Sequence, residues 1–268
     1  MDKGEYFASG SPEDTEEERL SLLESLLDPE TIRRMETLGI GSGWCCLEIG
    51  AGRGSMVRWL AARVGPSGRV LAADIDLRFL ERIHLSNVES RHHDLREADF
   101  EPSAYDFVHC RAVLMHLAKP EEALARMARA VRPGGWLLIQ EGDYGWFGSV
   151  DPTYPGASEF DRTMRASLDA VQSRGFVQSY FGRRLPGLVE RIGFANFGSE
   201  GSVYIGRGGN NPLGRFHSLS ARIPGNADRL IQLGVRTREQ NDHVLRMYDD
   251  PAFEFVGPTF FSAWAQRP

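Results

Sequence analysis

The chain has 268 residues, of which 41% are hydrophobic and 25% charged, and its formal net charge at pH 7 is −6. This composition is ordinary for a globular protein, and the absence of an apolar run of about 18 residues argues against a membrane-spanning protein and a membrane partner. Nucleic-acid affinity comes from basic groups that neutralise phosphates, so the acidic balance and the lack of a Lys/Arg cluster disfavour a DNA or RNA partner.

The N-terminus and the cysteines indicate the cellular setting. The N-terminal stretch MDKGEYFASGSPEDTEEERL is acidic and lacks the apolar core of a signal peptide, so we expect a cytoplasmic protein. Cys45, Cys46 and Cys110 all fall in apolar runs, and their odd number argues against a disulfide framework. We therefore expect buried free thiols and a reducing compartment.

The first predicted elements are helical. Residues 14–39 read as two short helices, with Asp14 or Thr15 as the N-cap and Gly39 as the C-cap. We expect residues 1–42 to form a helical lid. Exposed helices here, together with an aromatic cap later in the chain, make a homodimer plausible.

Short apolar runs alternate with helical patterns in the next part of the chain. The expected strands are residues 44–50, 68–74, 88–94, 105–114 and 136–142, and the expected helices are residues 55–65, 76–85 and 120–131. Such alternation is typical of right-handed strand–helix–strand units, which build a mostly parallel sheet covered on both faces. Ligands of these sheets bind beyond the carboxyl ends of the strands.

The chain changes character after Gly142, where the aromatic and glycine-rich segment DYGWFGSVDPTYPG begins. We expect a helix at 159–173 and two more strands, at 198–205 and 254–265. Residues 209–249 have helical patches without a clear period. The fold class is thus α/β, a doubly wound, mostly parallel, seven-stranded sheet with a cap inserted after the fifth strand, its segments at about 145–190 and 209–250.

The segment CCLEIGAGRGSMVRWL places a glycine-rich turn between a strand and a helix, which is typical of a nucleotide site. The glycines are Gly50, Gly52 and Gly54, whereas a dinucleotide fingerprint has its third glycine three positions after the second. A carboxylate at Glu48 would repel a pyrophosphate but not a cationic cofactor. Both features disfavour a nicotinamide-dependent oxidoreductase; the alternative to a ligand site is a turn that only permits tight packing.

Four segments, LEIGAGRGS, AADID, YDFVHCRAVLMHL and VRPGGWLLIQEGD, together resemble the class I S-adenosylmethionine-dependent methyltransferases. The resemblance covers roughly residues 40–145 and is greatest to the small-molecule branch related to quinone-biosynthesis enzymes. It implies a Rossmann-like methyltransferase domain over residues 43–268. It also implies S-adenosyl-L-methionine as the methyl donor and S-adenosyl-L-homocysteine as the product.

The resemblance further implies a set of cofactor-binding residues. The glycine turn would lie under the methionine part and ribose, with Glu48 orienting it and facing the positive end of the cofactor. Asp74 would accept the ribose hydroxyls, while Asp76 competes for that role but more simply caps the next helix. The remaining predicted cofactor residues are Ile75, Asp94 and Leu95 (the latter two at the adenine), Cys110 and Arg111 at the methionine moiety, and Tyr6 and Arg19 in the lid.

Two histidines at the end of the third strand do not predict a metal site, because neighbours in a strand point to opposite faces. His92 and His93 therefore cannot easily share one ion, and His93 is interpreted as a structural residue. Tyr6 and Arg19 would, without the resemblance, be ordinary surface positions.

Acceptor-side candidates follow the fourth and fifth strands. His116 either packs at a helix start or acts as a base, and its reference pKa suits that task. Asp143 and Tyr144, with Glu141 before them and the aromatic Trp146 and Phe147 behind them, would contact an apolar acceptor, unless this segment only joins the cap to the core. The Asn/Asp-Pro-Pro-aromatic motif of nucleic-acid amino-methyltransferases is absent.

The sequence therefore predicts methyl transfer by in-line displacement to a small, cyclic or aromatic acceptor, at oxygen, nitrogen or carbon, possibly in secondary metabolism. A cofactor-binding protein that catalyses a reaction other than methylation is the main alternative, because fold and cofactor do not determine the chemistry.

Overall fold

The computed structural model describes residues 12–223 and 225–268. Its described residues divide into two compact units. The core unit consists of residues 27–141, 181–201 and 261–268. The cap unit consists of residues 12–26, 142–180 and 202–260. The division passes through the first helix.

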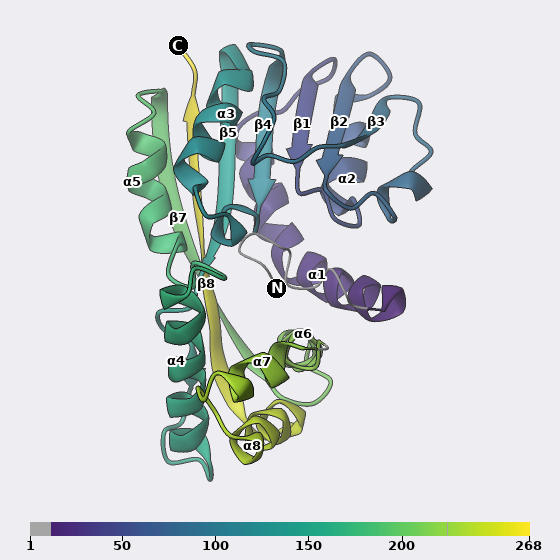
Figure 1. The fold of residues 1–268 in the computed structure, drawn as a ribbon. Helices are drawn as coiled ribbons and strands as arrows, with labels where there is room; N and C mark the ends of the chain where they lie inside the picture. Colours follow the sequence, from purple (N-terminus) through teal and green to yellow (C-terminus); the bar gives the residue numbers. More distant parts are fainter. Residues whose placement is uncertain (1–11, 224) are drawn as a thin grey trace. The chain divides into compact units, whose positions relative to one another are not determined.

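The core unit is built on a mostly parallel sheet, as predicted. Its strands are β1 (Cys45–Ile49), β2 (Arg69–Asp74), β3 (Val88–His92), β4 (Tyr105–Arg111) and β5 (Val131–Asp143). They lie in the order β3-β2-β1-β4-β5, with parallel pairing between neighbours (Figure 1). The reversal of strand order at β1 and β4 places the ends of these two strands at the position where doubly wound sheets bind ligands.

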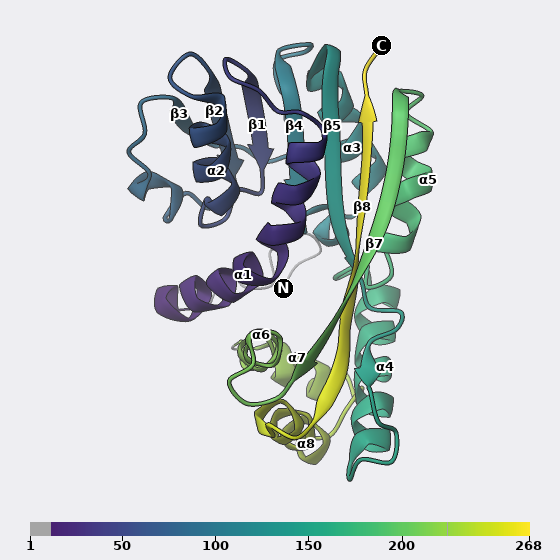
Figure 2. The ribbon, with the colours of Figure 1, turned by 180° about the vertical axis from the view of Figure 1, so that it is seen from behind.

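Two long C-terminal strands complete the sheet. They are β7 (Ala195–Arg207) and β8 (Glu254–Gln266). Strand β8 follows β5 in the sheet, and β7 pairs with β8 (Figure 2). The strands predicted at 198–205 and 254–265 are therefore confirmed, each slightly longer than expected.

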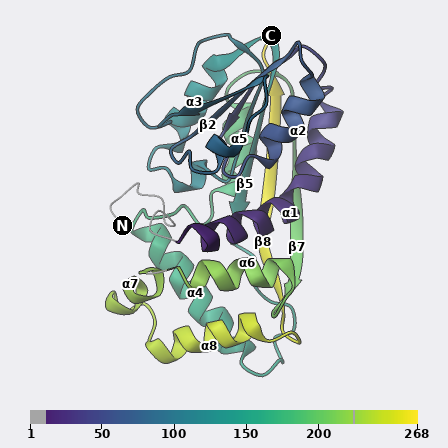
Figure 3. The ribbon, with the colours of Figure 1, turned by 90° about the vertical axis from the view of Figure 1, so that its right-hand side faces the viewer.

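Helices cover both faces of the parallel strands. The helices of the core unit are α2 (Ser55–Val64), α3 (Pro120–Ala130) and the short α5 (Leu185–Glu190). Figure 3 shows α2 and α3 on opposite sides of the strands. Helix α2 buries Met56, Val57 and Leu60 against the sheet, at positions spaced as an amphipathic helix requires. These apolar contacts hold the glycine turn, which directly precedes α2.

The cap unit is mainly helical. Its helices are α4 (Ala157–Ser173), α6 (Pro212–Ala221), α7 (Asn226–Gln232) and α8 (Arg238–Asp249). A short strand, β6 (Gly148–Ser149), pairs antiparallel with β8. Helices α4, α6 and α8 pack around an aromatic cluster that includes Phe147, Phe160, Tyr248 and Phe255. The described residues of the segment 209–249, which has no clear period in the sequence, thus include α6, α7 and α8, and α6 and α8 contribute side chains to this cluster.

Two predicted helical regions were wrong in detail. Residues 14–39 form one helix, α1 (Glu13–Thr37), rather than two, although it contains Pro29. Proline removes one backbone donor, but the helix continues past it to Thr37, and Met35 in this second half is fully buried in the core.

The helix expected at 76–85 is only a single turn, η1 (Leu80–Arg82). The side chain of Asp76 accepts from the backbone N–H of Arg78, which makes a local turn. One turn suffices to bury Phe79 and Leu80, so tertiary packing overrides the helical pattern.

Two further features of the described residues bear on the sequence analysis. Within 12–223 and 225–268, no helix is sufficiently long and apolar to cross a membrane. The three cysteines are free; Cys46 and Cys110 are buried in the sheet and Cys45 is half-buried.

Candidate active site

The glycine turn after β1 has no room for a side chain at two of its glycines, whereas the space beside the third is open. All three have a positive φ, +68° at Gly50, +54° at Gly52 and +81° at Gly54, a backbone region that favours glycine. A Cβ on Gly50 would lie 2.2 Å from a methyl group of Val113, and one on Gly54 would lie 2.4 Å from Ile83. A Cβ on Gly52 would meet nothing within 4 Å. Gly52 therefore presents bare backbone to open space.

Asp74 lies directly beside this open backbone. One carboxylate oxygen accepts from the N–H of Gly52 at 2.8 Å, and the other accepts from the N–H of Asp76 at 3.0 Å. Burial raises the pKa of Asp74 above its usual value, although these hydrogen bonds oppose the shift. Each oxygen keeps a second lone pair for a ligand hydroxyl.

The surroundings of Asp74 fit a nucleoside cofactor. The next side chain, Ile75, is 45% exposed although it is large and apolar. The open backbone at Gly52 allows a ligand to approach closely. The carboxylate can accept hydrogen bonds from ribose hydroxyls, and the exposed apolar side chain can cover the face of a base. The predicted residues Gly52, Asp74 and Ile75 thus come together at the carboxyl end of the sheet.

The end of β3 carries the residues predicted at the adenine. Asp94 forms a bidentate ion pair with Arg96, which holds the pKa of its carboxyl below the usual range. Leu95 is buried. His93 stacks on Phe100 with ring centroids 3.8 Å apart, as a packing residue does. Among the residues described, no group of three or more histidine, cysteine or acidic side chains could hold a metal ion.

Glu48 has a partner that the sequence analysis does not foresee. Its two carboxylate oxygens lie 2.7 and 2.9 Å from Nδ1 of His109, on the neighbouring strand β4. The other ring nitrogen lies 3.1 Å from the side-chain oxygen of Gln140 on β5. Glu48 and His109 are 3% and 0% exposed. Glu48 thus has a hydrogen-bonding partner inside the sheet, and its predicted role at the cofactor stays a prediction.

The same polar chain continues to helix α1 through Arg111. The side-chain oxygen of Gln140 accepts from the Thr31 hydroxyl at 2.7 Å, and this hydroxyl accepts from the guanidinium of Arg111 at 2.8 Å. Arg111 also forms an ion pair with Asp28 at 2.8 Å. These bonds tie the second half of α1 to the ends of β4 and β5. The side chain of Arg111 therefore positions α1. The backbone of Arg111 is left for the predicted contact with the methionine moiety.

A buried carboxylate shapes the loop after β4. Glu141 is fully buried and accepts hydrogen bonds from the backbone N–H groups of Val113, Leu114 and Met115, at 3.0, 2.6 and 3.3 Å. Burial raises its pKa to about 7. The last residue of this turn, η2 (Leu114–His116), is the half-buried His116. Glu141, an acceptor-side candidate in the sequence, instead anchors the turn that carries His116.

The remaining predicted residues lie elsewhere. Cys110 is fully buried in β4. Arg19 belongs to the cap unit, where it forms a buried ion pair with Glu16 at 2.7 Å. Tyr6 lies outside the described residues. The predicted roles of Tyr6 and Arg19 at the cofactor stay predictions.

Asp143 and Tyr144 also belong to the cap unit. Asp143 is buried and accepts from the N–H of Gly145 at 2.9 Å. Tyr144 packs at the edge of the aromatic cluster, and burial raises its pKa to about 12. Trp146, expected beside the acceptor, is 74% exposed. The phenol of Tyr144 thus stays protonated at neutral pH.

Sequence reasoning missed His109, Gln140 and Ala112. His109 and Gln140 are polar residues in otherwise apolar strands, a pattern that signals a buried polar partner. Ala112 has φ +57° where β4 ends, an unusual backbone for a residue other than glycine. Nothing in the local sequence signals that conformation, which is typical of functional sites.

Comparisons with known proteins identify relatives of this chain. Residues 17–197 match the family model described as a methyltransferase domain. The methyltransferase str3 of Strobilurus tenacellus is 31% identical over 183 residues, which cover 67% of this chain and 63% of that protein. The ubiquinone/menaquinone biosynthesis C-methyltransferase UbiE of Ectopseudomonas mendocina is 32% identical over 115 residues, or 40% of this chain and 45% of that protein. The chain thus spans less than two thirds of these relatives.

A solved structure shares the fold. It is phosphoethanolamine N-methyltransferase 2 of Haemonchus contortus in complex with phosphomonomethylethanolamine and S-adenosylhomocysteine. The alignment has a TM-score of 0.55 and 19% identity, and it covers 90% of this chain and 52% of that one. At this identity the likeness concerns the fold alone.

Proposed function

We propose, because the chain belongs to the family of S-adenosylmethionine-dependent methyltransferases, that it transfers a methyl group from S-adenosylmethionine to a small, ring-containing acceptor. The observation that carries this proposal is the convergence of Gly52, Asp74 and Ile75 at the carboxyl end of the sheet. An acidic residue beside open glycine backbone suits the ribose of a nucleoside cofactor.

The cofactor supplies an electrophilic methyl group on a sulfonium, which reacts by in-line displacement. The protein has mainly to align the acceptor with that methyl group, and positioning contributes roughly 7–11 kcal/mol in favourable cases. Asp74 binds the ribose hydroxyls, and Asp94 accepts from the adenine amino group beside Ile75 and Leu95. The backbone of Cys110 and Arg111 contacts the methionine moiety.

His116 is proposed as the base for an acidic acceptor. It ends the turn that Glu141 anchors through three backbone amides, so the histidine is held on a fixed support rather than on a loose loop. We expect His116→Ala to retain cofactor affinity and to lower kcat about a hundredfold. Calorimetry and turnover together test this role, and full activity of the variant would remove His116 from the mechanism.

The acceptor class is proposed as a small cyclic or aromatic compound of secondary metabolism, methylated at oxygen, nitrogen or carbon. The likeness to the ubiquinone/menaquinone biosynthesis C-methyltransferase of Ectopseudomonas mendocina supports placing the chain near the quinone-biosynthesis branch.

Incubation with S-adenosylmethionine and a panel of phenols, hydroxyquinones and aromatic amines tests the proposal. We expect release of S-adenosylhomocysteine and an acceptor that gains one methyl group by mass spectrometry. Calorimetry is expected to detect binding of S-adenosylhomocysteine and none of NAD. Preference for NAD would overturn the cofactor assignment, whereas conversion of an acceptor without methyl gain would favour the reaction other than methylation.

A further inference from the structure

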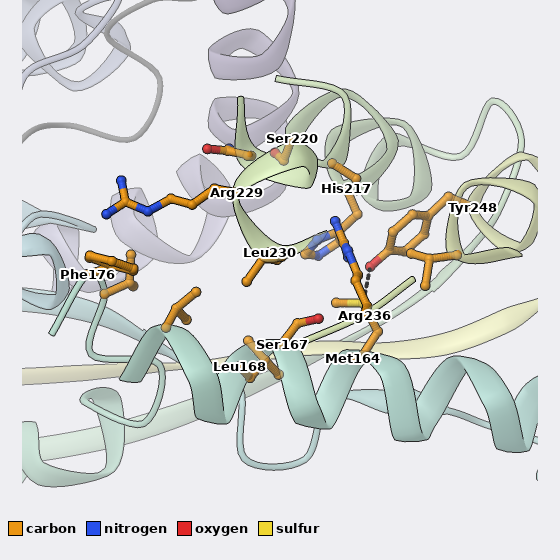
Figure 4. A pocket seen from close by; sticks show the side chains of 15 residues that line it. Met164, Ser167, Leu168, Phe176, His217, Ser220, Arg229, Leu230, Arg236 and Tyr248 are labelled. Atoms are coloured by element: carbon orange, nitrogen blue, oxygen red, sulfur yellow. Dashed lines mark hydrogen bonds between the residues drawn. The ribbon is translucent and has the colours of Figure 1, made fainter. Parts of the chain in front are cut away.

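A pocket of about 220 Å³ lies within the cap unit, apart from the residues of the candidate active site described above. Its walls come from all four cap helices, α4, α6, α7 and α8, and from the segments that follow α4 and precede α8 (Figure 4). Because one unit supplies every wall, the pocket is defined without reference to the core unit.

Most of the pocket wall is apolar. Leu168, Val171, Leu230 and Val244 line it, together with the aromatic side chains of Phe176 and Tyr248. Two serines in the wall are satisfied internally: Ser167 donates to the carbonyl of Thr163, and Ser220 donates to the carbonyl of Phe216. These hydroxyl groups therefore do not need a hydrogen bond from a ligand.

Two buried polar side chains in the same wall have unmet hydrogen-bonding capacity. His217 and Arg236 are 6% and 7% exposed, and both line the pocket. Nε2 of His217 and Nε of Arg236 have no hydrogen-bond partner among the described residues. In Figure 4 both side chains are drawn among the apolar groups of the wall. Buried polar groups normally find a partner, so this pair indicates a missing ligand.

The charge of Arg236 is not balanced within the pocket. No aspartate or glutamate occurs among the lining residues, all of which the structure describes. Burial lowers the pKa of Arg236 below its usual value, and burial lowers the pKa of His217 to about 3, which leaves its imidazole neutral. The lining thus contains two guanidinium groups, that of Arg236 and that of Arg229, which lies over the ring of Phe176 at 3.9 Å, together with the neutral imidazole of His217. An unpaired buried guanidinium destabilises the fold, and an anion would remove that cost.

We propose that this pocket binds a small apolar carboxylic acid of about one ring, with its carboxylate on Arg236 and His217. The guanidinium donates from Nε to the carboxylate, the neutral imidazole donates from Nε2, and the apolar wall covers the ring. The size follows from volume: a cavity of about 150 Å³ accommodates benzene, so about 220 Å³ suits a ring with a carboxylate or a short acidic side chain.

Calorimetric titration of the full chain with benzoate and phenylacetate, without cofactor, tests this proposal. Both acids are expected to bind, and benzyl alcohol, which matches benzoate in size but lacks the charge, is expected to bind about tenfold more weakly or worse. Because no methyl transfer is measured, failure here is separate from failure of the proposed function. Equal binding of benzoate and benzyl alcohol would overturn the proposal.

Arg236→Met removes the charge and retains an apolar chain of similar length. We expect this variant to lose benzoate affinity about tenfold or more, Arg236→Lys to retain part of it, and Arg238→Met to bind as the wild type does. Arg238 is a matched control because it is 74% exposed and is not in the pocket wall.

Without ligand, Arg236→Met is also expected to raise the thermal midpoint, because an unpaired buried charge has been removed. A merely structural arginine would give a lower midpoint and unchanged benzoate affinity, and that result would overturn the proposal. His217→Phe gives a second measurement that does not depend on Arg236. It keeps the ring volume and is expected to weaken benzoate about threefold.

Discussion

At the scale of single residues, the candidate cofactor site depends on one carboxylate and one glycine. Asp74 holds the backbone of Gly52 at 2.8 Å, so it shapes the turn as well as offering oxygen to a ligand. Gly52 differs from Gly50 and Gly54 because open space, rather than Val113 or Ile83, lies where a Cβ would stand. The spacing of the glycines in the sequence does not distinguish these roles.

We expect Asp74→Ala to weaken S-adenosylhomocysteine binding at least a hundredfold, because the charge-assisted hydrogen bonds to the ribose and the support of Gly52 are lost together. Asp76→Ala is the matched control, since its carboxylate bonds Arg78 rather than the glycine turn. Calorimetry measures the affinity of the two variants for S-adenosylhomocysteine and decides which aspartate contacts the ribose. A larger loss in Asp76→Ala would reverse the assignment of the ribose contact.

At the scale of elements, hydrogen bonds between buried polar groups select which strands lie side by side, a choice that apolar packing alone leaves open. The pair of Glu48 on β1 and His109 on β4 lies between neighbouring strands, and Gln140 extends it to β5. Glu141 likewise joins the end of β5 to the turn η2. These bonds hold the loops at the carboxyl ends of the strands in one arrangement, as a binding site requires.

His109→Leu is expected to lower the free energy of unfolding by about 3–5 kcal/mol, because Glu48 becomes a buried carboxylate without its partner. The double variant Glu48→Leu, His109→Leu is expected to regain much of this loss. Urea denaturation monitored by circular dichroism measures both. A single variant as stable as the wild type would show that the pair contributes little to the stability of the sheet.

The raised pKa of Glu141 predicts a pH-dependent stability. The carboxyl has its usual pKa of about 4.5 in the unfolded chain and a pKa of about 7 in the folded chain, so the folded chain holds a proton between these values that the unfolded chain has lost. Stability therefore falls as pH rises from about 4.5 to about 7, by roughly 3 kcal/mol from this group. Denaturation of wild type and Glu141→Gln across this range is expected to show a smaller decline in the variant; identical curves would contradict it.

At the scale of the whole molecule, residues far apart in sequence share one unit. The cap unit unites residues 12–26, 142–180 and 202–260, and strand β8 has residues in both units. Of the residues predicted at the acceptor, Asp143 and Tyr144 belong to the cap unit and His116 to the core unit. The two candidate ligand sites are likewise assigned to different units, the glycine turn to the core and the carboxylate pocket to the cap.

Cofactor binding is expected to stabilise the whole chain by mass action. With S-adenosylhomocysteine at a hundred times its Kd, the free energy of unfolding is expected to rise by about 2.7 kcal/mol. Hydrogen exchange measured with this ligand is expected to show new protection at residues 50–54 and 74–76. Protection confined to residues outside the core unit would contradict the proposed cofactor site.

The sequence by itself determined the parallel sheet, the glycine turn and the position of Asp74, because local periodicity and short spacings between residues indicate these features. Only the tertiary structure decided that His109 faces Glu48, that Glu141 anchors the turn of His116, and that Arg236 and His217 share a pocket. Each of these depends on side chains from separate elements. Periodicity reports which face of an element is buried, but it does not report what that face meets.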